Sequence, residues 1–273
     1  MIFLYWNIHK NQDLFPLIQN IIIEREIDLL MIAEYPSISP YVLLNEINKS
    51  GYKYKYVKPI ITNEKVRIYI RENFGNLENF EDETGISAKR LYSEILNEYI
   101  TLVVCHLPSK LNNSDANQSE LTEDIKEFID RVEKKSGHHR TIICGDLNMN
   151  PFDEGLIKAR GLHAVMERNI ALKNAAIING KKYYFFYNPM WSFLGDMGKG
   201  KVCGTMYYNS SKPINYYWHL YDQILMRPEM IPFFDDMKLD IITEISENKL
   251  ITSNNIIDSK YSDHLPLIFK FNI

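Results

Sequence analysis

The sequence has few cysteines, and they follow no pattern. Its 273 residues include 3 cysteines, an odd number with no paired spacing. No group of cysteines and histidines has the spacing of a zinc finger. Cys105 and Cys144 lie in apolar stretches, where a thiol behaves as a small buried hydrophobic group. This pattern excludes a disulfide framework, and we expect a reducing, cytoplasmic setting.

The sequence also lacks a long apolar stretch and an excess of positive charge. No uninterrupted apolar stretch approaches the roughly 18 residues of a membrane helix, and the apolar start Met1–Trp6 is too short for a secretory signal. We therefore expect neither a membrane span nor a leader. With 31 basic and 35 acidic residues the net charge is -4, which does not indicate tight nonspecific binding to nucleic acid. A local basic groove is still compatible with this balance.

The sequence does contain enough apolar material for a large core, since it is 45% hydrophobic and 24% charged. No repeat, low-complexity tract or linker interrupts it, so we expect one domain over residues 1–273. Strands alternate with helices early, and strand pairs cluster in the middle. This order favours an α/β (α+β) fold with one mixed sheet, or with two sheets packed face to face.

The expected elements follow from apolar periodicity. The predicted helices are Asp13–Glu26, Tyr41–Asn48 and Ser119–Ser136. The predicted strands are Ile2–Trp6, Leu29–Ala33, Tyr52–Val57, Val66–Arg71, Arg90–Leu96, Tyr99–Cys105, Thr141–Cys144, Tyr221–Met226 and Leu265–Phe271, with a hairpin turn at Asn97–Glu98. The stretch Lys181–Tyr217 is rich in glycine and aromatic residues, so we expect short strands and long loops there.

Polar side chains recur at the ends of these strands. They are Asn7, Glu34, His106, Asp146 with Asn148, and Asp263 with His264 just before the last strand; Asp222 begins a strand. Active sites collect at strand ends because rigid strands fix the loops that follow them. The repetition of polar groups therefore predicts one site built from distant segments.

The spacing within Gly145–Asn148 has a physical reason. In extended backbone, residues two apart share a face, so Asp146 and Asn148 point the same way while Leu147 points to the core. Gly145 lets the backbone turn or approach a ligand closely. A carboxylate beside an amide can orient a water molecule and contact a phosphate. The set of polar residues at the strand ends is rich in hard oxygen ligands, which select Mg²⁺ or Mn²⁺ rather than zinc.

These motifs, in this order, resemble the endonuclease/exonuclease/phosphatase superfamily, whose fold is like that of deoxyribonuclease I. The resemblance is carried by Trp6-Asn7, Glu34, His106, Gly-Asp-Leu-Asn at 145–148, Asp222-Gln223 and Ser-Asp-His at 262–264, and it spans nearly the whole chain. It implies a four-layer α/β/β/α sandwich of two mixed sheets with helices outside. It also implies in-line attack of water on phosphorus.

The resemblance implies a role for each matching residue. Glu34 matches the main metal ligand, and Asn7 matches the amide beside the metal. Asp263 is expected to be a further residue of the metal site. Asp146 matches the group that orients or deprotonates the attacking water, and Asn148 matches a phosphate contact. The remaining matches are His264, which binds the phosphate or transfers a proton; Asp222, which orients it; His106, a second phosphate-binding histidine; and Glu64, a partner for His106.

One position departs from the pattern, because His9 stands where some relatives carry an acid near the metal.

The leading interpretation is a nuclease that cleaves DNA or RNA with Mg²⁺ or Mn²⁺. The alternatives are a phosphatase or phosphodiesterase acting on a phosphorylated lipid, inositol or small molecule, and an inactive binding module. Lys199 and Lys201 flank a loop glycine and are candidates for substrate contact. The sequence does not determine the oligomeric state.

Overall fold

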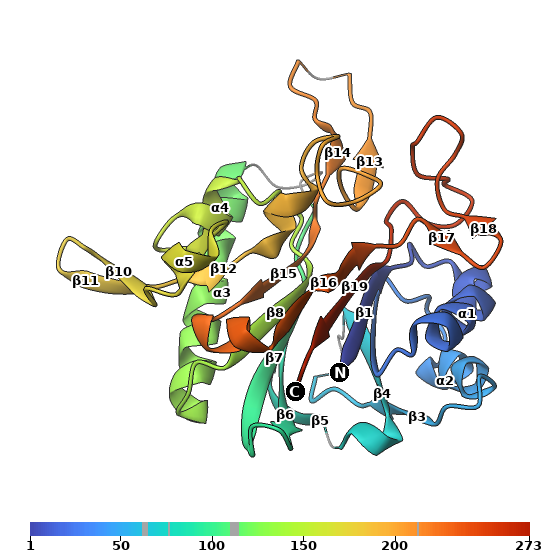
Figure 1. Ribbon diagram of the computed structural model, residues 1–273, viewed down its shortest axis with the longest axis horizontal. Coiled ribbons are helices and arrows are strands. Elements are labelled where there is room, and N and C mark those ends of the chain that lie inside the picture. The colour runs from blue at the N-terminus through green and yellow to red at the C-terminus, as the bar shows by residue number, and fades with distance from the viewer. Residues whose placement is uncertain (62–64, 76, 110–114, 212) are drawn as a thin grey trace.

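The computed structural model describes residues 1–61, 65–75, 77–109, 115–211 and 213–273 (Figure 1). Within these ranges the helices are α1 (Phe15–Arg25), α2 (Pro40–Asn48), α3 (Asp115–Ser136), α4 (Glu154–Ile157) and α5 (Arg168–Ala171), with 3-10 helices η1 (Gln12–Leu14), η2 (Glu72–Phe74), η3 (Pro189–Phe193) and η4 (Pro228–Phe233).

The described strands form two large sheets and three small hairpins. The first sheet has the order β16 (Phe234–Ile241), β19 (Leu267–Phe271), β1 (Ile2–Asn7), β2 (Leu29–Ala33), β4 (Val66–Arg71) and β3 (Tyr54–Val57). The second has the order β5 (Leu77–Glu83), β6 (Ile86–Ser93), β7 (Glu98–His106), β8 (Thr141–Asp146), β15 (Asp222–Met226), β12 (Phe186–Tyr187) and β9 (Ala164–Val165). The hairpins are β10 (Ala175–Ile178) with β11 (Lys181–Tyr184), β13 (Met206–Tyr208) with β14 (Tyr217–His219), and β17 (Glu244–Ile245) with β18 (Asn248–Lys249).

Both large sheets are mixed. In the first, β1 and β2 run parallel, whereas β19 and β4 run antiparallel to them. In the second, β7 and β8 run parallel, and β15 runs antiparallel to β8. The carboxyl ends of β1 and β2 therefore share one edge of the first sheet, and those of β7 and β8 share one edge of the second.

The two sheets pack face to face between helices. One hydrophobic core joins the facing sides of the sheets and includes the apolar face of α1, while a second core lies between the second sheet and α3. Figure 1 shows α1 and α2 beside the first sheet and α3 and α4 beside the second. Strands β2, β8 and β15 are buried along their whole length because both of their faces are covered. The four-layer sandwich is thus confirmed.

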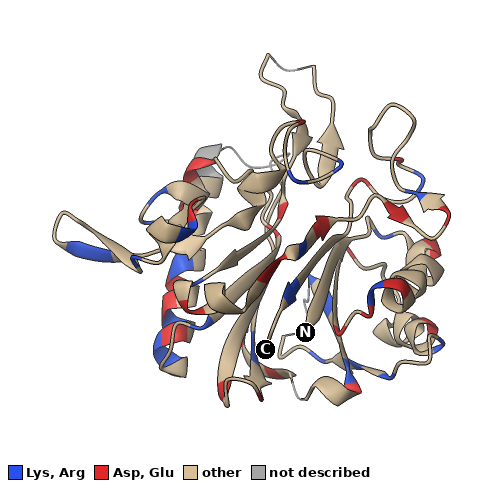
Figure 2. Ribbon diagram, in the orientation of Figure 1, with Lys and Arg blue, Asp and Glu red and all other residues tan. Residues whose placement is uncertain are grey.

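Helix α3 shows why the strongest periodic pattern was predictable. Ile125, Phe128, Ile129 and Val132 lie on one buried face, as their spacing predicts. The exposed face carries alternating acidic and basic residues (Figure 2). The prediction of a start at Ser119 was wrong by four residues, since the helix begins at Asp115 in a polar stretch without apolar periodicity.

The predictions failed mainly at sheet edges. Strands β5 and β16 were not predicted; each is the outermost strand of its sheet, and both are rich in acidic residues. Charged side chains are typical of exposed edges, and they hide the apolar alternation that marks a strand. The hairpin between β6 and β7 is confirmed, but its turn begins earlier, because β6 ends at Ser93 and Asn97 takes the left-handed conformation.

The structure also bears on two smaller expectations. Cys105 and Cys144 are fully buried within β7 and β8, as expected for small apolar groups. Over the described residues, no helix combines the length and apolar character needed to cross a membrane.

Candidate active site

The predicted residues meet where the two sheets join. Asn7 pairs in register with Ala33, which directly precedes Glu34, and His106 pairs in register with Asp146. The side-chain amide of Asn7 donates to Glu34 Oε1 at 3.2 Å and to Asp146 Oδ2 at 3.2 Å. One amide therefore bridges the carboxyl ends of both sheets and fixes two carboxylates relative to each other.

Glu34 is held in an unusual backbone conformation. Its φ is 47°, in the left-handed region that few non-glycine residues adopt. Its carbonyl oxygen accepts a hydrogen bond from the backbone nitrogen of Lys10 at 2.8 Å. The carboxylate remains partly exposed, and its Oε1 lies 3.8 Å from Nε2 of His106. Strain of this kind, at a cost of order 1 kcal/mol, persists where surrounding contacts impose it and is frequent at functional sites.

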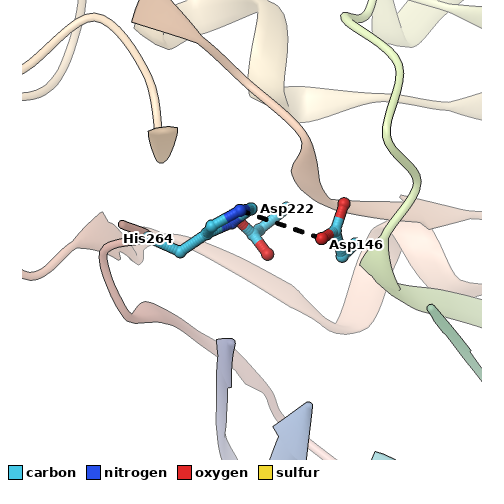
Figure 3. A group of neighbouring side chains, drawn as sticks. All are labelled: Asp146, Asp222 and His264. Carbon is cyan, nitrogen blue, oxygen red and sulfur yellow. Dashed lines mark hydrogen bonds and ion pairs between the residues drawn. The ribbon is translucent and has the colours of Figure 1, made fainter. Parts of the chain in front are cut away.

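A buried pair forms the centre of the site. Asp222 Oδ2 lies 2.7 Å from Nδ1 of His264, and Asp222 is fully buried. Asp222 also pairs in register with Asp146 across β15 and β8, so two carboxylates from neighbouring strands face the same space. Nε2 of His264 lies 3.9 Å from Asp146 Oδ2, and Figure 3 shows the three side chains converging.

Burial and neighbouring charges shift the proton affinities of this group. Burial, reinforced by the charge of Asp222, raises the pKa of Asp146 from 3.8 to about 7. Burial alone would lower the pKa of His264, but the carboxylate of Asp222 outweighs it and raises that pKa to about 10. Burial lowers the pKa of His106, and the charge of Glu34 opposes this effect. The site therefore pairs a proton acceptor near neutral pH, Asp146, with a protonated imidazole.

The donor set fits a divalent metal ion. Within the described part of the chain, the ion-pair partners of Glu34, Asp146, Asp222 and Asp263 are all histidines, so no lysine or arginine neutralises these carboxylates. Asp222 Oδ1 is buried and has no hydrogen-bond partner in that part either. Several carboxylates gathered at one place repel one another, and a cation among them offsets this repulsion.

Among the described residues, one group of the site has ligand atoms close enough together to share an ion. One ligand atom from each of Asp146, Asp222 and His264 lies within 4.8 Å of the others. In this subset, however, Nδ1 of His264 is already bonded to Asp222. Glu34 and Asp263, the carboxylates that the resemblance implies as metal ligands, have side chains 28% and 38% exposed, and Nδ1 of His9 lies between 3.4 and 3.7 Å from each.

The structure shows contacts of Gly145 and Asn148 that the motif alone did not predict. A Cβ atom on Gly145 would lie 1.9 Å from the carbonyl oxygen of Cys105, so the neighbouring strand β7 requires glycine at this position. The backbone nitrogen of Asn148 donates to Asp146 Oδ1 at 2.9 Å. Its side-chain amide donates to the carbonyl of Leu107 at 2.9 Å, which leaves the side-chain oxygen as the group able to accept a bond from a ligand.

The described contacts bear on two of the predicted substrate-binding residues, Lys199 and Lys201. Nζ of Lys199 donates to the carbonyl of Asp236 on β16, and no described contact joins Lys199 or Lys201 to the site. Glu64 lies outside the described residues. His106, the residue that Glu64 was expected to partner, has a buried Nδ1 without a hydrogen-bond partner among the residues that are described.

The structure adds two residues that were not predicted to belong to the site. Nδ1 of His9 lies 3.7 Å from Glu34 Oε2 and 3.4 Å from Asp263 Oδ1, and its place two residues after Asn7 was the available signal. Thr205 accepts a hydrogen bond from the backbone nitrogen of Asp222 through Oγ1 and another from Leu265 through its carbonyl. Thr205 thereby braces Asp222 against the segment of His264, and the irregular sequence around it carried no signal.

One cavity lies away from this group of residues. It has a volume of about 370 Å³ and is lined by Glu133, Asp130, Lys134, His138 and Tyr184, among others, between α3 and β11. Its acids are already paired, Glu133 with Arg227 and Asp130 with Lys126. It therefore offers no group poised for hydrolysis.

Comparison with known proteins identifies the fold. No family model matches the sequence, and no curated protein matches it. Among solved structures, an endonuclease/exonuclease/phosphatase family protein from Leptotrichia buccalis superposes with a TM-score of 0.57 over 100% of both chains, at 15% identity. The chain has the endonuclease/exonuclease/phosphatase fold. The resemblance found in the sequence is thus confirmed for the fold.

Other proteins with this fold are also similar over their full length. An AP endonuclease from Archaeoglobus fulgidus has a TM-score of 0.55 at 13% identity, with 100% of both chains covered. The 3′ phosphatase NExo from Neisseria, solved with a product DNA hairpin, has a TM-score of 0.55 at 13% identity, also with 100% of both chains covered. The endonuclease/exonuclease/phosphatase fold therefore accounts for the whole chain, and its residues must decide the chemistry.

Proposed function

We propose that this protein is a divalent-metal-dependent phosphoester hydrolase that cleaves phosphodiester bonds of nucleic acid. The observation that carries the proposal is the buried Asp222–His264 pair facing Asp146, next to Glu34 and Asn7, at the shared end of the two sheets. This arrangement places a proton acceptor, a proton donor and uncompensated oxygen ligands around one space, which is the set that phosphoester hydrolysis needs.

In the proposed mechanism Asp146 accepts the proton of the attacking water. A pKa of about 7 gives Asp146 both a large ionised fraction and a useful proton affinity at neutral pH. The protonated imidazole of His264 donates to an oxygen of the scissile phosphate and can pass its proton to the leaving oxygen as the ester P–O bond breaks. Asp222 holds the imidazole in this orientation through Nδ1. Nε2 of His106 lies 3.9 Å from Asp146 Oδ2, where it can contact a second phosphate oxygen. Glu34, Asn7 and Asp263, the residues that the resemblance implies as metal ligands, would hold a divalent ion, which would supply further positive charge.

Two observations support nucleic acid as the substrate. The similar proteins named above include an AP endonuclease and a phosphatase solved with DNA. In addition, Met206 of β13 bridges to His264, so the hairpin β13–β14 adjoins the site, and Figure 1 shows it projecting beyond the sheets. This hairpin and its connecting loop expose Tyr208, Tyr216 and Tyr217, each about half exposed. Exposed aromatic rings beside a phosphate site suit stacking on unpaired bases.

A phosphatase or phosphodiesterase acting on a phosphorylated lipid, inositol or small molecule is the second candidate. It is favoured by the absence, among the described residues, of any lysine or arginine in ion-pair range of the site carboxylates, and by the net charge of -4. A polynucleotide groove usually carries excess positive charge.

A substrate panel separates the two. Purified protein with Mg²⁺ or Mn²⁺ is incubated with single- and double-stranded DNA, RNA, phosphoinositides and simple phosphomonoesters, with and without EDTA. We expect polynucleotide cleavage that EDTA abolishes. Phosphate release from a small substrate without cleavage of any polynucleotide contradicts the nuclease and supports the second candidate.

Site variants test the assignment of residues. Asp146→Asn and His264→Ala should each reduce activity at least about a hundredfold, because each removes an acid–base or charge-stabilising group. Asp124→Asn, on the exposed face of α3, is the matched control and should retain full activity. Undiminished activity in Asp146→Asn would show that the active site lies elsewhere.

A further inference from the structure

The cavity between α3 and β11 lies at the opposite end of β8 from the proposed active site. Its lining comes from the second half of α3, from the segment that leads into β8, and from Lys182 and Tyr184 of β11. His139 of this lining lies two residues before Thr141, where β8 begins, whereas Asp146 ends that strand. Extended backbone rises about 3.3 Å per residue, so Thr141 and Asp146 lie about 17 Å apart. The cavity is therefore separate from the proposed active site.

Both acids in the lining have partners within the protein. Glu133 is buried and accepts hydrogen bonds from Nε and Nη2 of Arg227 at 2.8 and 3.0 Å. Its Oε2 also lies 2.8 Å from Nδ1 of His139. Asp130 forms an ion pair with Lys126, and its Oδ1 lies 4.0 Å from Nη2 of Arg227. Opposite charges this close offset one another, so neither acid presents an uncompensated negative charge to the cavity.

Two lysines reach the cavity from different elements. Lys134 belongs to the last turn of α3, Lys182 belongs to β11, and both line the cavity. Figure 2 shows basic residues on both elements. In the described part of the chain, neither lysine forms an ion pair with an acid. Nζ of Lys182 lies 4.6 Å from the ring centroid of Tyr184, so its ammonium group lies over another residue of the lining. Each ammonium group offers three N–H donors. Two positive charges without a protein anion therefore adjoin one cavity.

We propose that this cavity binds a phosphoryl group, as free phosphate or as a small phosphate ester, between Lys134 and Lys182. A phosphoryl group carries a charge of about -1.5 to -2 at pH 7, which two ammonium groups match, and lysine binds phosphate as a compact point charge. The cavity volume of about 370 Å³ lies in the lower part of the ~300–1,000 Å³ range of small-molecule sites. The inference does not depend on the proposed hydrolysis, because no residue of this lining takes part in it.

The chain offers a matched control for each of the two lysines. Lys134→Met and Lys182→Met remove one charge each and keep an apolar side chain of similar length. Lys135→Met and Lys181→Met remove the same charge from the neighbouring position. Lys135 lies 3.6 Å from Glu81, and Lys181 precedes Lys182 in β11, so its side chain points to the other face of the hairpin. All four lysines are exposed, so each variant should fold, which urea unfolding checks.

Titration calorimetry in EDTA measures binding to each variant. The probes are inorganic phosphate and phenylphosphonate, whose P–C bond is not an ester and is not hydrolysed. Every protein also carries His264→Ala, which removes a phosphate-binding group of the proposed active site. We expect Lys134→Met and Lys182→Met each to weaken binding about tenfold, as loss of a hydrogen bond to a charged group does, while the two control variants stay within twofold. Tighter binding of phenylphosphonate assigns the site to a phosphate ester, and tighter binding of phosphate assigns it to the free ion.

Three results overturn the inference. The first is that neither probe binds the His264→Ala protein at concentrations up to about 10 mM. The second is an equal loss of affinity in Lys135→Met and Lys181→Met, which would assign the binding to net charge and not to the cavity. The third is unchanged affinity in both cavity variants, which would place the bound anion elsewhere. The titrations contain no metal and require no turnover, so they stand or fall separately from the proposed hydrolase.

Discussion

Replacing Asp146 with asparagine should stabilise the metal-free protein at pH 8 while it removes activity. Asp146 is 1% exposed, and it faces Asp222 across the paired strands β8 and β15. Its two oxygens accept hydrogen bonds from Asn148 at 2.9 Å and from Asn7 at 3.2 Å. The substitution keeps the shape of the side chain and the bond from Asn148, but it removes the charge and the bond from Asn7.

The size of the effect follows from the pKa of Asp146, which is raised from 3.8 to about 7 by burial and by Asp222. A raised acid pKa means that the folded protein binds a proton more tightly than the unfolded chain, so stability falls as the pH rises from about 3.8 to about 7. At about 1.4 kcal/mol per pKa unit, the ionised carboxylate costs about 4 kcal/mol at pH 8. Losing the bond from Asn7 costs about 1–2 kcal/mol. The net gain is about 2 kcal/mol, or about 5 °C in Tm.

Urea unfolding in EDTA, at pH 8 and at pH 5, measures this difference. At pH 5 the cost of ionisation falls to about 2 kcal/mol, so the lost hydrogen bond cancels the gain. Asp124→Asn should change stability at neither pH, because Asp124 is exposed. The reasoning is refuted if Asp146→Asn is less stable than the wild type at pH 8, or if its advantage is the same at both values.

Three further predictions concern other parts of the structure. Asp222→Asn should lower kcat about 10³–10⁴-fold, because an amide cannot keep His264 protonated at Nδ1. Urea unfolding should show that the variant is folded. Retained turnover would contradict the catalytic role of the Asp222–His264 pair. Burial would raise the pKa of Glu133, but the bonds from His139 and Arg227 outweigh it and lower the pKa from 4.5 to about 2. The ionised carboxylate therefore contributes to the free energy of unfolding above pH 4.5, and this contribution is lost as the pH falls towards 2. Glu133→Gln should lower the free energy of unfolding in urea by about 3 kcal/mol at pH 7, and its stability should fall less between pH 4.5 and pH 2 than that of the wild type. Gly145→Ala should lower the free energy of unfolding by more than about 3 kcal/mol, since its Cβ would lie 1.9 Å from the carbonyl oxygen of Cys105. A soluble variant with an unchanged free energy of unfolding would show that β7 and β8 can separate at this point.

The site residues were predictable because each one directly follows or precedes a strong apolar strand. Asn7, Asp146 and His106 lie at the carboxyl ends of β1, β8 and β7, and these ends are visible in the sequence as abrupt changes from apolar to polar residues. The structure confirms that they lie together. Their catalytic and metal-binding roles stay predictions, to be tested by the variants above.

Other features depended on contacts that no local pattern encodes. The edge strands β5 and β16 have few apolar residues, and pairing with a neighbour defines them. Thr205 and His9 belong to irregular or strained segments, and their positions result from bonds to residues far away in the sequence. Gly145 was interpreted as letting the backbone turn or approach a ligand, and the structure adds a constraint that the sequence did not reveal, the carbonyl of Cys105.

The sequence by itself determined the central strands, the longest helix and the chemical types gathered at the strand ends. It could do so because apolar periodicity and strand ends are local properties, readable within a few residues. Only the tertiary structure decided that Asn7 joins the two sheets through Glu34 and Asp146, that Asp222 lies behind His264, and that His9 faces Glu34 and Asp263. Those distances, and the proton affinities that follow from them, arise from the packing of two sheets and the exclusion of water between them, which no single segment specifies.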